Sequence, residues 1–546
     1  MNRKEFAEFL IGSTEHTRDE YEKMYPERNL DEKAMVTRFA PSPTGFVHIG
    51  SLFVSFLDTK FAKQTNGISY LRVEDTDQKR TTESISNITR DLSNFGINFD
   101  EGMLADDKEI GNYGPYLQSK RRDIYRAYAK DLIEKGLAYP CFLSEEEMNE
   151  IRSMQEDIKA RIGIYGKYAK YRNLSIEEAV AKIEAGEKYI IRLKSPGDFD
   201  NKIIFDDVIR GKMEFNENDL DIVIIKSDGL PTYHFAHAID DHLMHTTHVI
   251  RGDEWVSSIP LHVQLFDMLG FKAPRYLHIS PLMKKDEGTV RKLSKRKDPE
   301  AAVSYYHEEG IPTYAVLLYI MTVANSNFEA WLDANPYGKI EDFDLTFNKM
   351  SASGSLFDMD KLLNISKNYI SRLKATEVYD MALEYSKEYD SELYDLLTKY
   401  KDYSINIFNI EREQKKPRKD LAKLSDIKNE MWYMYDELFN PEKYDFQNIT
   451  DKDEIKTILT TYMDKYYTVD DKDSWFGNIK ALCDELGYAS DMKAYKENPD
   501  NYKGNVADVS TVLRVALTSR AQTPDLYEIM RLFGKDRINN RYKKFV

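Results

Sequence analysis

The chain has 546 residues, of which 42% are hydrophobic and 31% charged, so a globular protein of about three or four domains is expected instead of a single core. Its net charge of −16 argues against nucleic-acid binding through an indiscriminate positive field, but it leaves room for a few basic contact strips. Two cysteines, Cys141 and Cys483, cannot build a disulfide framework, and no apolar run is long enough to span a membrane. Because the N-terminus resembles neither a secretory signal nor a transit peptide, we expect a cytoplasmic protein.

Strand and helix signals alternate after a charged, helical segment at 1–34. "AMVTRFA" is a short apolar run, a bend with two prolines follows it, and "SLFVSFLDTKFAKQ" carries apolar residues at helical spacing. "ISYLRVED" predicts a second strand, and "TTESISNITRDLSNFG" predicts a second helix that Gly96 ends. This β-α-β-α order indicates a parallel sheet with a right-handed crossover.

A polar, helix-rich stretch with some strand signal (189–193 and 203–209) interrupts this pattern over 112–220. Apolar strand signals then resume in "LDIVIIKSDG" and "THVIRGDEW", which we interpret as further strands of the interrupted sheet. After about residue 300 the pattern is mainly helical. We therefore expect a multidomain α/β plus all-α protein, with a domain inserted into a doubly wound, Rossmann-like parallel sheet.

The stretch "RFAPSPTGFVHIG" at 38–50 joins the first predicted strand to the first predicted helix. In an open α/β sheet, ligands bind beyond the carboxyl ends of the strands, where helix N-termini present free N–H groups. Pro41 and Pro43 fix this turn, Gly45 and Gly50 allow close approach to the main chain, and His48 can donate a hydrogen bond to a phosphate. On spacing alone, a buried turn with a structural histidine explains the stretch equally well.

A second element, "RKLSKRKD" at 291–298, follows a loop-like stretch and supplies lysines suited to charge developing on a phosphorus atom. The chain contains neither G-x-x-x-x-G-K-[ST] nor G-x-G-x-x-G, so the common nucleotide-binding loops do not account for the stretch at 38–50. In this order, "HIGS" at 48–51 and "KLSKR" at 292–296 resemble the paired signatures of class I aminoacyl-tRNA synthetases. Ser51 and Arg296 depart from the usual forms of these signatures, in a way that is familiar in the glutamyl branch.

The neighbouring motifs "TRFAPSPTGFVHIG", "YLRVEDTDQKR", "PTYHFAHAIDDHLM" and "HVIRGDEW" are similar to those of the glutamyl-tRNA synthetases. "EDTD" at 74–77 and the C-terminal "VSTVLRVALTSRAQTPDLYEIMRLFGKDR" resemble the bacterial type, whose anticodon-binding domain is helical. The resemblance implies six sections: an N-terminal extension at 1–34, catalytic halves at 35–111 and 221–280, an acceptor-binding insertion at 112–220, a stem-contact domain with the "KLSKR" loop at 281–370, and a helical anticodon-binding domain at 371–546.

The resemblance also implies roles for single residues. Arg38 and Arg251 would clamp the two carboxylates of glutamate, because a planar guanidinium binds a carboxylate through two parallel N–H bonds. The other residues expected at the amino acid are Ser42, Glu74 (toward the ammonium group), Tyr233 and, as a wall, Trp255. Those expected at ATP are Gly45, His48, Gly50, Glu254, Leu293 and Lys295. His48, Lys292 and Lys295 would serve catalysis by stabilising the triphosphate during transfer.

The implied activity is the two-step ligation of L-glutamate to tRNA(Glu), with ATP as co-substrate and Mg²⁺ carried mainly by its phosphates. Whether tRNA(Gln) is also charged is left open by the sequence; a monomer is expected. Five histidines crowd 234–248, but this segment matches the substrate-pocket region of the family, so no metal site is expected there. Because the inserted region offers only Cys141, no structural zinc is expected either.

Three alternatives remain open at this point. A glutamyl-queuosine-type paralogue would lack the helical C-terminal half, and a glutaminyl enzyme would carry archaeal-like signatures. A non-catalytic tRNA-binding relative need not keep His48, Glu74, Lys295 and both arginines.

The basic strip 412–423 is expected to touch RNA.

Overall fold

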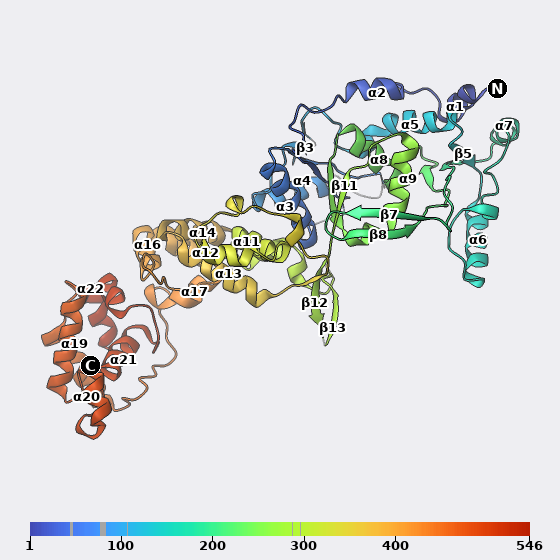
Figure 1. The fold of residues 1–546 in the computed structure, drawn as a ribbon. Coiled ribbons are helices and arrows are strands. Elements are labelled where there is room, and N and C mark those ends of the chain that lie inside the picture. The colour runs from blue at the N-terminus through green and yellow to red at the C-terminus, as the bar shows by residue number, and fades with distance from the viewer. Residues whose placement is uncertain (44–46, 77–82, 106–107, 287, 295) are drawn as a thin grey trace. The chain divides into compact units, whose positions relative to one another are not determined.

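The computed structural model describes residues 1–43, 47–76, 83–105, 108–286, 288–294 and 296–546 (Figure 1). The chain forms two compact units. One consists of Met1–Tyr305 with Leu317–Asp358, and the other of Tyr306–Val316 with Met359–Val546. No helix in the described ranges is long and apolar enough to cross a membrane.

The N-terminal segment forms α1 (Arg3–Ile11) and α2 (Arg18–Met24), each begun by a capping box. Both helices pack against α5 (Arg122–Glu134). Arg28, which follows α2, donates to both carboxylate oxygens of Glu101 at 2.8 and 2.9 Å and lies over the ring of Tyr113. The extension is therefore part of the first unit and not a loose tail.

The central sheet follows the predicted β-α-β-α order. Its strands are β1 (Val36–Phe39), β2 (Ile68–Leu71), β3 (Glu101–Met103) and β4 (Glu109–Ile110), linked by α3 (Ile49–Gln64) and α4 (Glu83–Asn94). β1, β2 and β3 are parallel, so the predicted parallel sheet is confirmed. α3 is almost wholly buried because its apolar residues occupy nearly every face.

A separate two-stranded sheet lies beside β1. It contains β10 (His248–Gly252) and the parallel strand β11 (Arg275–Ile279). Thr247 N donates to Val36 O at 2.9 Å, which joins β10 to β1 across more than two hundred residues of sequence. The helices α8 (Tyr233–Leu243) and α9 (Ile259–Leu269) pack against each other. β1 and β10 thus end side by side.

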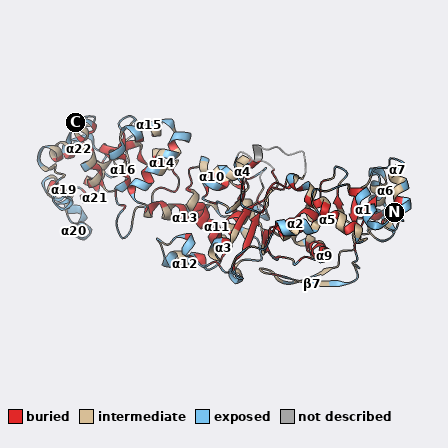
Figure 2. Cartoon of the chain, turned by 90° about the horizontal axis from the view of Figure 1, so that it is seen from above, coloured by how far each residue is buried: buried red, intermediate tan, exposed pale blue. Residues whose placement is uncertain are grey.

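The intervening segment builds its own sheets. One is antiparallel, with β5 (Ala138–Cys141), β6 (Ile190–Leu193) and β9 (Val223–Ile225); the other is a hairpin of β7 (Lys202–Asp207) and β8 (Gly211–Asn216). The helices α6 (Glu145–Asp157) and α7 (Ile176–Glu184) are largely exposed (Figure 2). The interpretation of "LDIVIIKSDG" as a strand of the central sheet was wrong, because β9 pairs with β6. Period and polarity cannot tell which sheet a buried strand joins.

The remaining elements are mostly helical, as predicted. The first unit also holds β12 (Leu282–Asp286), β13 (Thr289–Lys292), α12 (Phe328–Ala334) and β14 (Ser355–Leu356); α10 (Ser304–Glu308) and α11 (Thr313–Ala324) lie where the chain passes between the units. The second unit contains α13 (Met359–Arg372), α14 (Ala375–Tyr389), α15 (Ser391–Lys399), α16 (Lys401–Asn409), α17 (Asp426–Met431), α18 (Lys452–Thr461), α19 (Lys472–Leu486), α20 (Met492–Glu497), α21 (Val506–Thr518) and α22 (Leu526–Tyr542). One hydrophobic core runs through these helices. Arg412, the first residue of the basic strip 412–423, is buried and donates to the carbonyls of Phe408, Ile370 and Leu373.

Candidate functional site

A cavity of about 540 Å³ opens where β1 and β10 end and α3 and α8 begin. Its position follows from the topology, because parallel strands present their carboxyl ends at one edge of a sheet and the next helices start there. Most of the residues selected from the sequence line it, although they come from five separate stretches of the chain. These are Arg38, Ser42, His48, Gly50, Glu74, Tyr233, Arg251, Glu254, Trp255 and Lys292.

Arg38 lies at the end of β1 and is buried. Its Nε is 3.5 Å from Asp241 Oδ2, and its Nη1 donates to Ile250 O at 3.3 Å. Burial is the largest single influence and disfavours the charge of Arg38, but Asp241, Tyr233 and Asp58 together outweigh it, so the pKa of Arg38 is raised. A permanent cation with a carboxylate behind it therefore borders the cavity.

Arg251, on β10, is the second buried cation of the cavity. Its Nε donates to His278 Nε2 at 2.9 Å, and its Nη1 lies 3.2 Å from His262 Nδ1. The guanidinium carbon lies 4.6 Å from the centre of the Tyr276 ring. Arg251 thus contacts two imidazoles and an aromatic ring, whereas Arg38 contacts a carboxylate.

Glu74 follows β2 and reaches the same cavity. Burial raises its pKa to about 7, although Arg72 and Arg38 oppose the shift. Its Oε1 accepts from Arg72 Nη2 at 3.1 Å. A carboxyl group poised between its neutral and ionised forms suits a ligand whose own cation would complete the ionisation.

Two aromatic side chains close this end of the cavity. Tyr233 is the first residue of α8, and its ring centre lies 4.4 Å from that of Trp255. The Tyr233 ring also stacks on His237 at 5.8 Å. These contacts restrict the space around the two arginines to a small polar ligand.

The other end of the cavity is formed by the start of α3. His48 is the N-cap residue, and its Nδ1 accepts from Gly50 N at 2.9 Å. In the neutral ring the proton therefore resides on Nε2, which makes that atom a donor. A Cβ at Gly50 would lie 3.2 Å from His48 Nδ1, so a glycine here preserves the position of the ring.

Lys292, the last residue of β13, and Glu254 face each other across this end, with 3.4 Å between Lys292 Nζ and Glu254 Oε2. Both side chains are about half exposed, at 56% and 52%, so the pair is weak and can rearrange around a charged ligand. A Cβ at Gly252 would lie 2.4 Å from Glu254 Oε2. A larger residue at position 252 would therefore require the half-exposed Glu254 carboxylate to move.

Arg291 and Ser294, at the start of the "KLSKR" region, are held by a neighbouring carboxylate. Asp298 accepts two hydrogen bonds from Arg291, at 2.6 and 2.8 Å, and one from Ser294 N at 2.8 Å. Leu293 is buried and does not line the cavity. Two of the predicted ATP-site residues, Gly45 and Lys295, lie outside the described residues.

Sequence reasoning missed the buried charges behind the arginines. Asp241 accepts from Arg72 Nη1 at 2.6 Å and lies 2.9 Å from His237 Nδ1, and all three side chains are fully buried. Burial would raise the pKa of Asp241, but Arg72, His237 and Arg38 together lower it well below its ordinary value. The signal in the sequence was "DD" at 240–241 in a helix whose other residues are apolar, tyrosine or histidine, because ionised residues are almost never buried without partners.

The crowded histidines at 234–248 each have a protein partner. His234 lies 2.9 Å from His262, His242 lies 2.9 Å from Glu22, and His245 Nε2 lies 2.9 Å from Tyr25 O. His242 also stacks on Phe271, with 3.6 Å between ring centres. Hydrogen bonds and ring contacts within the protein therefore hold these side chains.

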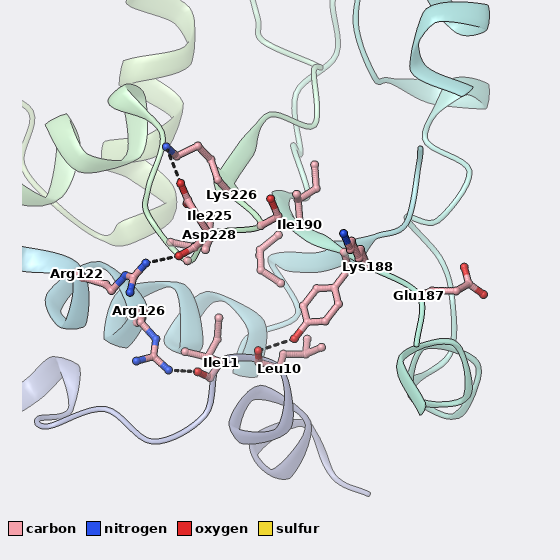
Figure 3. Close-up of a pocket in the computed structure, with 14 residues that line it drawn as sticks. Leu10, Ile11, Arg122, Arg126, Glu187, Lys188, Ile190, Ile225, Lys226 and Asp228 are labelled. Carbon is pink, nitrogen blue, oxygen red and sulfur yellow. Dashed lines mark hydrogen bonds and ion pairs between the residues drawn. The ribbon is translucent and has the colours of Figure 1, made fainter. Parts of the chain in front are cut away.

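A second cavity, of about 670 Å³, lies between α1, α5, β6 and the turn after β9 (Figure 3). Arg122 and Arg126 line it and donate to the carbonyls of Asp228 and Ile11, while the Tyr189 hydroxyl donates to Leu10 O at 2.7 Å. No residue predicted to bind glutamate or ATP lines this cavity. It is therefore separate from the candidate active site.

Comparison with known proteins agrees with this geometry. Residues 34–364 match the family described as tRNA synthetases class I (E and Q), catalytic domain, and residues 377–546 match an anticodon binding domain. The chain is a class I tRNA synthetase. This confirms the resemblance that the "HIGS" and "KLSKR" signatures indicated.

Individual relatives in this synthetase family match the chain over its full length. A glutamate–tRNA ligase of Clostridium perfringens strain SM101 is 49% identical over 550 residues and covers 100% of both chains. One from Clostridium beijerinckii is 48% identical, again over 100% of each. The crystal structure of a glutamate tRNA ligase from Elizabethkingia meningosepticum in complex with its amino acid has a TM-score of 0.75 at 26% identity, covering 94% of this synthetase and 99% of that chain.

Proposed function

We propose that the chain ligates L-glutamate to tRNA(Glu) at the expense of ATP. The full-length similarity to glutamate–tRNA ligases supports this function, and the chemistry of the 540 Å³ cavity supports the amino acid. Glutamate carries two carboxylates and one ammonium group. The cavity offers two buried guanidiniums and one buried carboxyl group, so their charges complement each other.

The observation that carries the proposal is the convergence of Arg38, Arg251 and Glu74 on one cavity. Each arginine would take one carboxylate in the bidentate manner that a guanidinium allows. Glu74 would take the ammonium group, which favours its ionised form. A glutamine side chain has no second carboxylate, so the second arginine favours glutamate over glutamine.

In the first step, an oxygen of the glutamate α-carboxylate attacks the α-phosphorus of ATP. A bond from carboxylate oxygen to phosphorus forms, the bond to the bridging oxygen breaks, and pyrophosphate leaves. In the second step, a hydroxyl of the 3′-terminal adenosine of tRNA attacks the carbonyl carbon, loses its proton, and displaces AMP. Neither step needs a protein nucleophile, so catalysis consists of positioning and charge stabilisation.

The residues at the start of α3 would hold the nucleotide. His48 would donate from Nε2 to a phosphate oxygen, the N–H groups at the start of α3 would face negative charge, and Lys292 would add a mobile cation. We assign Gly45 and Lys295 to the same role because they lie in the matching motifs, as does Leu293, although Leu293 is buried and does not line the cavity. Ser42 and Glu254 complete the amino-acid and nucleotide ends, respectively.

Magnesium would accompany ATP. The cavity carboxyls already have partners, because Glu74 pairs with Arg72 and Glu254 with Lys292. Among the described residues, no group of three or more histidine, cysteine, aspartate or glutamate side chains could hold a metal ion. The residues therefore fit an ion held by phosphates and water better than one held by the protein, and it would neutralise charge on the leaving pyrophosphate.

We also propose the six-section division of the chain, a monomeric state and the cytoplasm as its compartment. The matched anticodon binding domain at 377–546 supports tRNA as the partner, and two free, buried cysteines suit a reducing compartment. We leave tRNA(Gln) as a second substrate to the experiment.

The test is a charging assay with radiolabelled glutamate and purified tRNA(Glu) and tRNA(Gln) side by side. Transfer of glutamate to tRNA(Glu) is expected, and transfer to tRNA(Gln) as well would identify a non-discriminating enzyme. Charging with glutamine instead of glutamate, or no charging of any tRNA, would contradict the proposal. Arg251→Ala serves as the matched inactive control.

A further inference from the structure

The hairpin of β7 and β8 ends in a turn that docks onto β11, next to the active site (Figure 1). Val208 N donates to Tyr276 O at 3.0 Å. Arg210 donates to His278 O at 3.1 Å and to Asp253 at 2.9 Å. The turn is therefore held by β11 and by the loop after β10, although the hairpin belongs to the intervening segment.

A chain of buried side chains leads from this turn to Arg251. Asp207 Oδ2 lies 2.7 Å from His278 Nδ1, and Arg251 Nε donates to His278 Nε2 at 2.9 Å. The three residues are 1%, 0% and 5% exposed, respectively. A charge at the end of β7 is thus two hydrogen bonds away from the arginine that borders the amino-acid pocket.

The chemistry of the chain fixes the direction of each hydrogen bond. An ionised carboxylate only accepts, so His278 must carry its proton on Nδ1. Burial lowers the pKa of His278, and its hydrogen bond to Asp207 only partly offsets this, so the ring is neutral near pH 7. Its Nε2 is then an acceptor, which the Arg251 Nε–H requires. With the opposite tautomer, two donors would face each other.

The arrangement holds Arg251 without neutralising it. Its Nε–H goes to His278, one Nη1–H to His262, and one Nη2–H toward Trp255 O at 3.4 Å. Of its five N–H groups, two then have no partner among the described residues, one on each terminal nitrogen. A carboxylate can accept from both terminal nitrogens of a guanidinium in bidentate fashion. Arg38, by contrast, shares its charge with Asp241.

We propose that Asp207 and His278 are positioning residues for glutamate binding. Asp207 selects the His278 tautomer, His278 orients the Arg251 guanidinium, and the docked hairpin thereby sets the affinity for the substrate carboxylate. This inference rests on the proposed function, in which Arg251 binds glutamate. Neither Asp207 nor His278 lines the amino-acid pocket, so the hairpin would act on the pocket through Arg251.

Asp207→Asn is the variant that reverses the tautomer while it keeps the turn; it also removes the Asp207 Oδ2 that accepts from His278 N at 3.2 Å. The asparagine Oδ1 can still accept from Ile209 N and Arg210 N, which Asp207 Oδ1 now does at 3.0 and 2.9 Å, so the turn is kept. Its Nδ2 would face His278 Nδ1 as a donor and reverse the tautomer. Asp206→Asn, an exposed neighbour with the same change of charge, is the matched control.

In the tRNA charging assay, Asp207→Asn should raise the KM for glutamate about 10- to 100-fold, as expected for loss of a hydrogen bond to a charged group. The KM for ATP should stay within about twofold, and Asp206→Asn should change neither. His278→Gln, whose side-chain oxygen can accept from Arg251 whatever residue 207 is, should make a subsequent Asp207→Asn change silent. An unchanged KM for glutamate in folded Asp207→Asn, an equal rise in both KM values, or additive effects of the two substitutions would overturn the proposal.

A spectroscopic arm does not depend on activity or on the folding of Asp207→Asn. In wild-type protein labelled with ¹⁵N-histidine, the signal absent from His278→Gln identifies His278. Its shifts should report a protonated Nδ1 and an unprotonated Nε2, and the reverse pattern would overturn the proposal. If wild-type protein charges no tRNA with glutamate, the proposed function fails while the tautomer result still decides the positioning chain.

Discussion

Glutamate binding should depend on pH through Glu74. In the free protein the pKa of this carboxyl group is about 7, because burial raises it more than Arg72 and Arg38 lower it. The substrate ammonium group would add a positive charge next to it and lower that pKa. Glutamate should therefore bind the ionised form and release a proton when it binds the protonated form.

The size of the effect follows from that pKa. With a value of 7, about one tenth of the carboxyl groups are ionised at pH 6 and about nine tenths at pH 8. The KM for glutamate should thus rise about tenfold as pH falls from 8 to 6, and about half a proton should be released per glutamate bound at pH 7. The same pKa also affects the stability of the free protein. Protonated Glu74 favours the folded state, so its contribution to the free energy of unfolding is lost as pH rises from 4.5 through 7.

Charging kinetics at pH 6, 7 and 8, together with calorimetry in buffers of different ionisation enthalpy, measure both quantities. The KM for ATP over the same range reports any general effect of pH. Glu254→Gln should keep the pH dependence of the KM for glutamate, and Glu74→Gln should remove it along with most of the affinity. A KM for glutamate that is constant between pH 6 and 8, with no proton release, would refute the reasoning.

Three further outcomes follow from single residues. Lys295→Ala should slow single-turnover adenylate formation on the order of 10²–10³-fold with little change in glutamate affinity, and an unchanged rate would contradict its role. Asp58 is fully buried, burial raises its pKa well above the ordinary value, and neither carboxyl oxygen has a hydrogen-bond partner among the described residues. The contribution of Asp58 to stability is present below pH 3.8 and is lost as pH rises. Asp58→Asn should therefore raise the free energy of unfolding, relative to the wild type, by about 1.4 kcal/mol more for each pH unit above 4, up to the pKa of Asp58 in the folded protein. An equal change in the free energy of unfolding at pH 5 and at pH 7 would rule this out. Arg28→Met breaks a largely buried pair with Glu101 and should lower the free energy of unfolding by about 3 kcal/mol, whereas the exposed control Lys33→Met should not.

The sequence by itself determined the local elements of the catalytic half and the identity of most cavity residues. Apolar spacing placed β1, α3, β2 and α4 correctly, because these periodicities reflect which face of each element is buried. The motifs around "HIGS" and "VIRGDEW" identified many of the residues that line the cavity. This is possible because the chemistry of a site allows only certain residue types at given positions of a motif.

Only the tertiary structure decided which groups stand behind these residues. Asp241 behind Arg38, and His278 with Asp207 behind Arg251, come from distant segments that no local pattern connects. The strand at 223–225 joined β6 for the same reason: a buried strand has apolar residues whichever sheet it enters. Burial and long-range pairing set the charge of Glu74 and the tautomer of His278, and both depend on distances that the linear sequence does not contain.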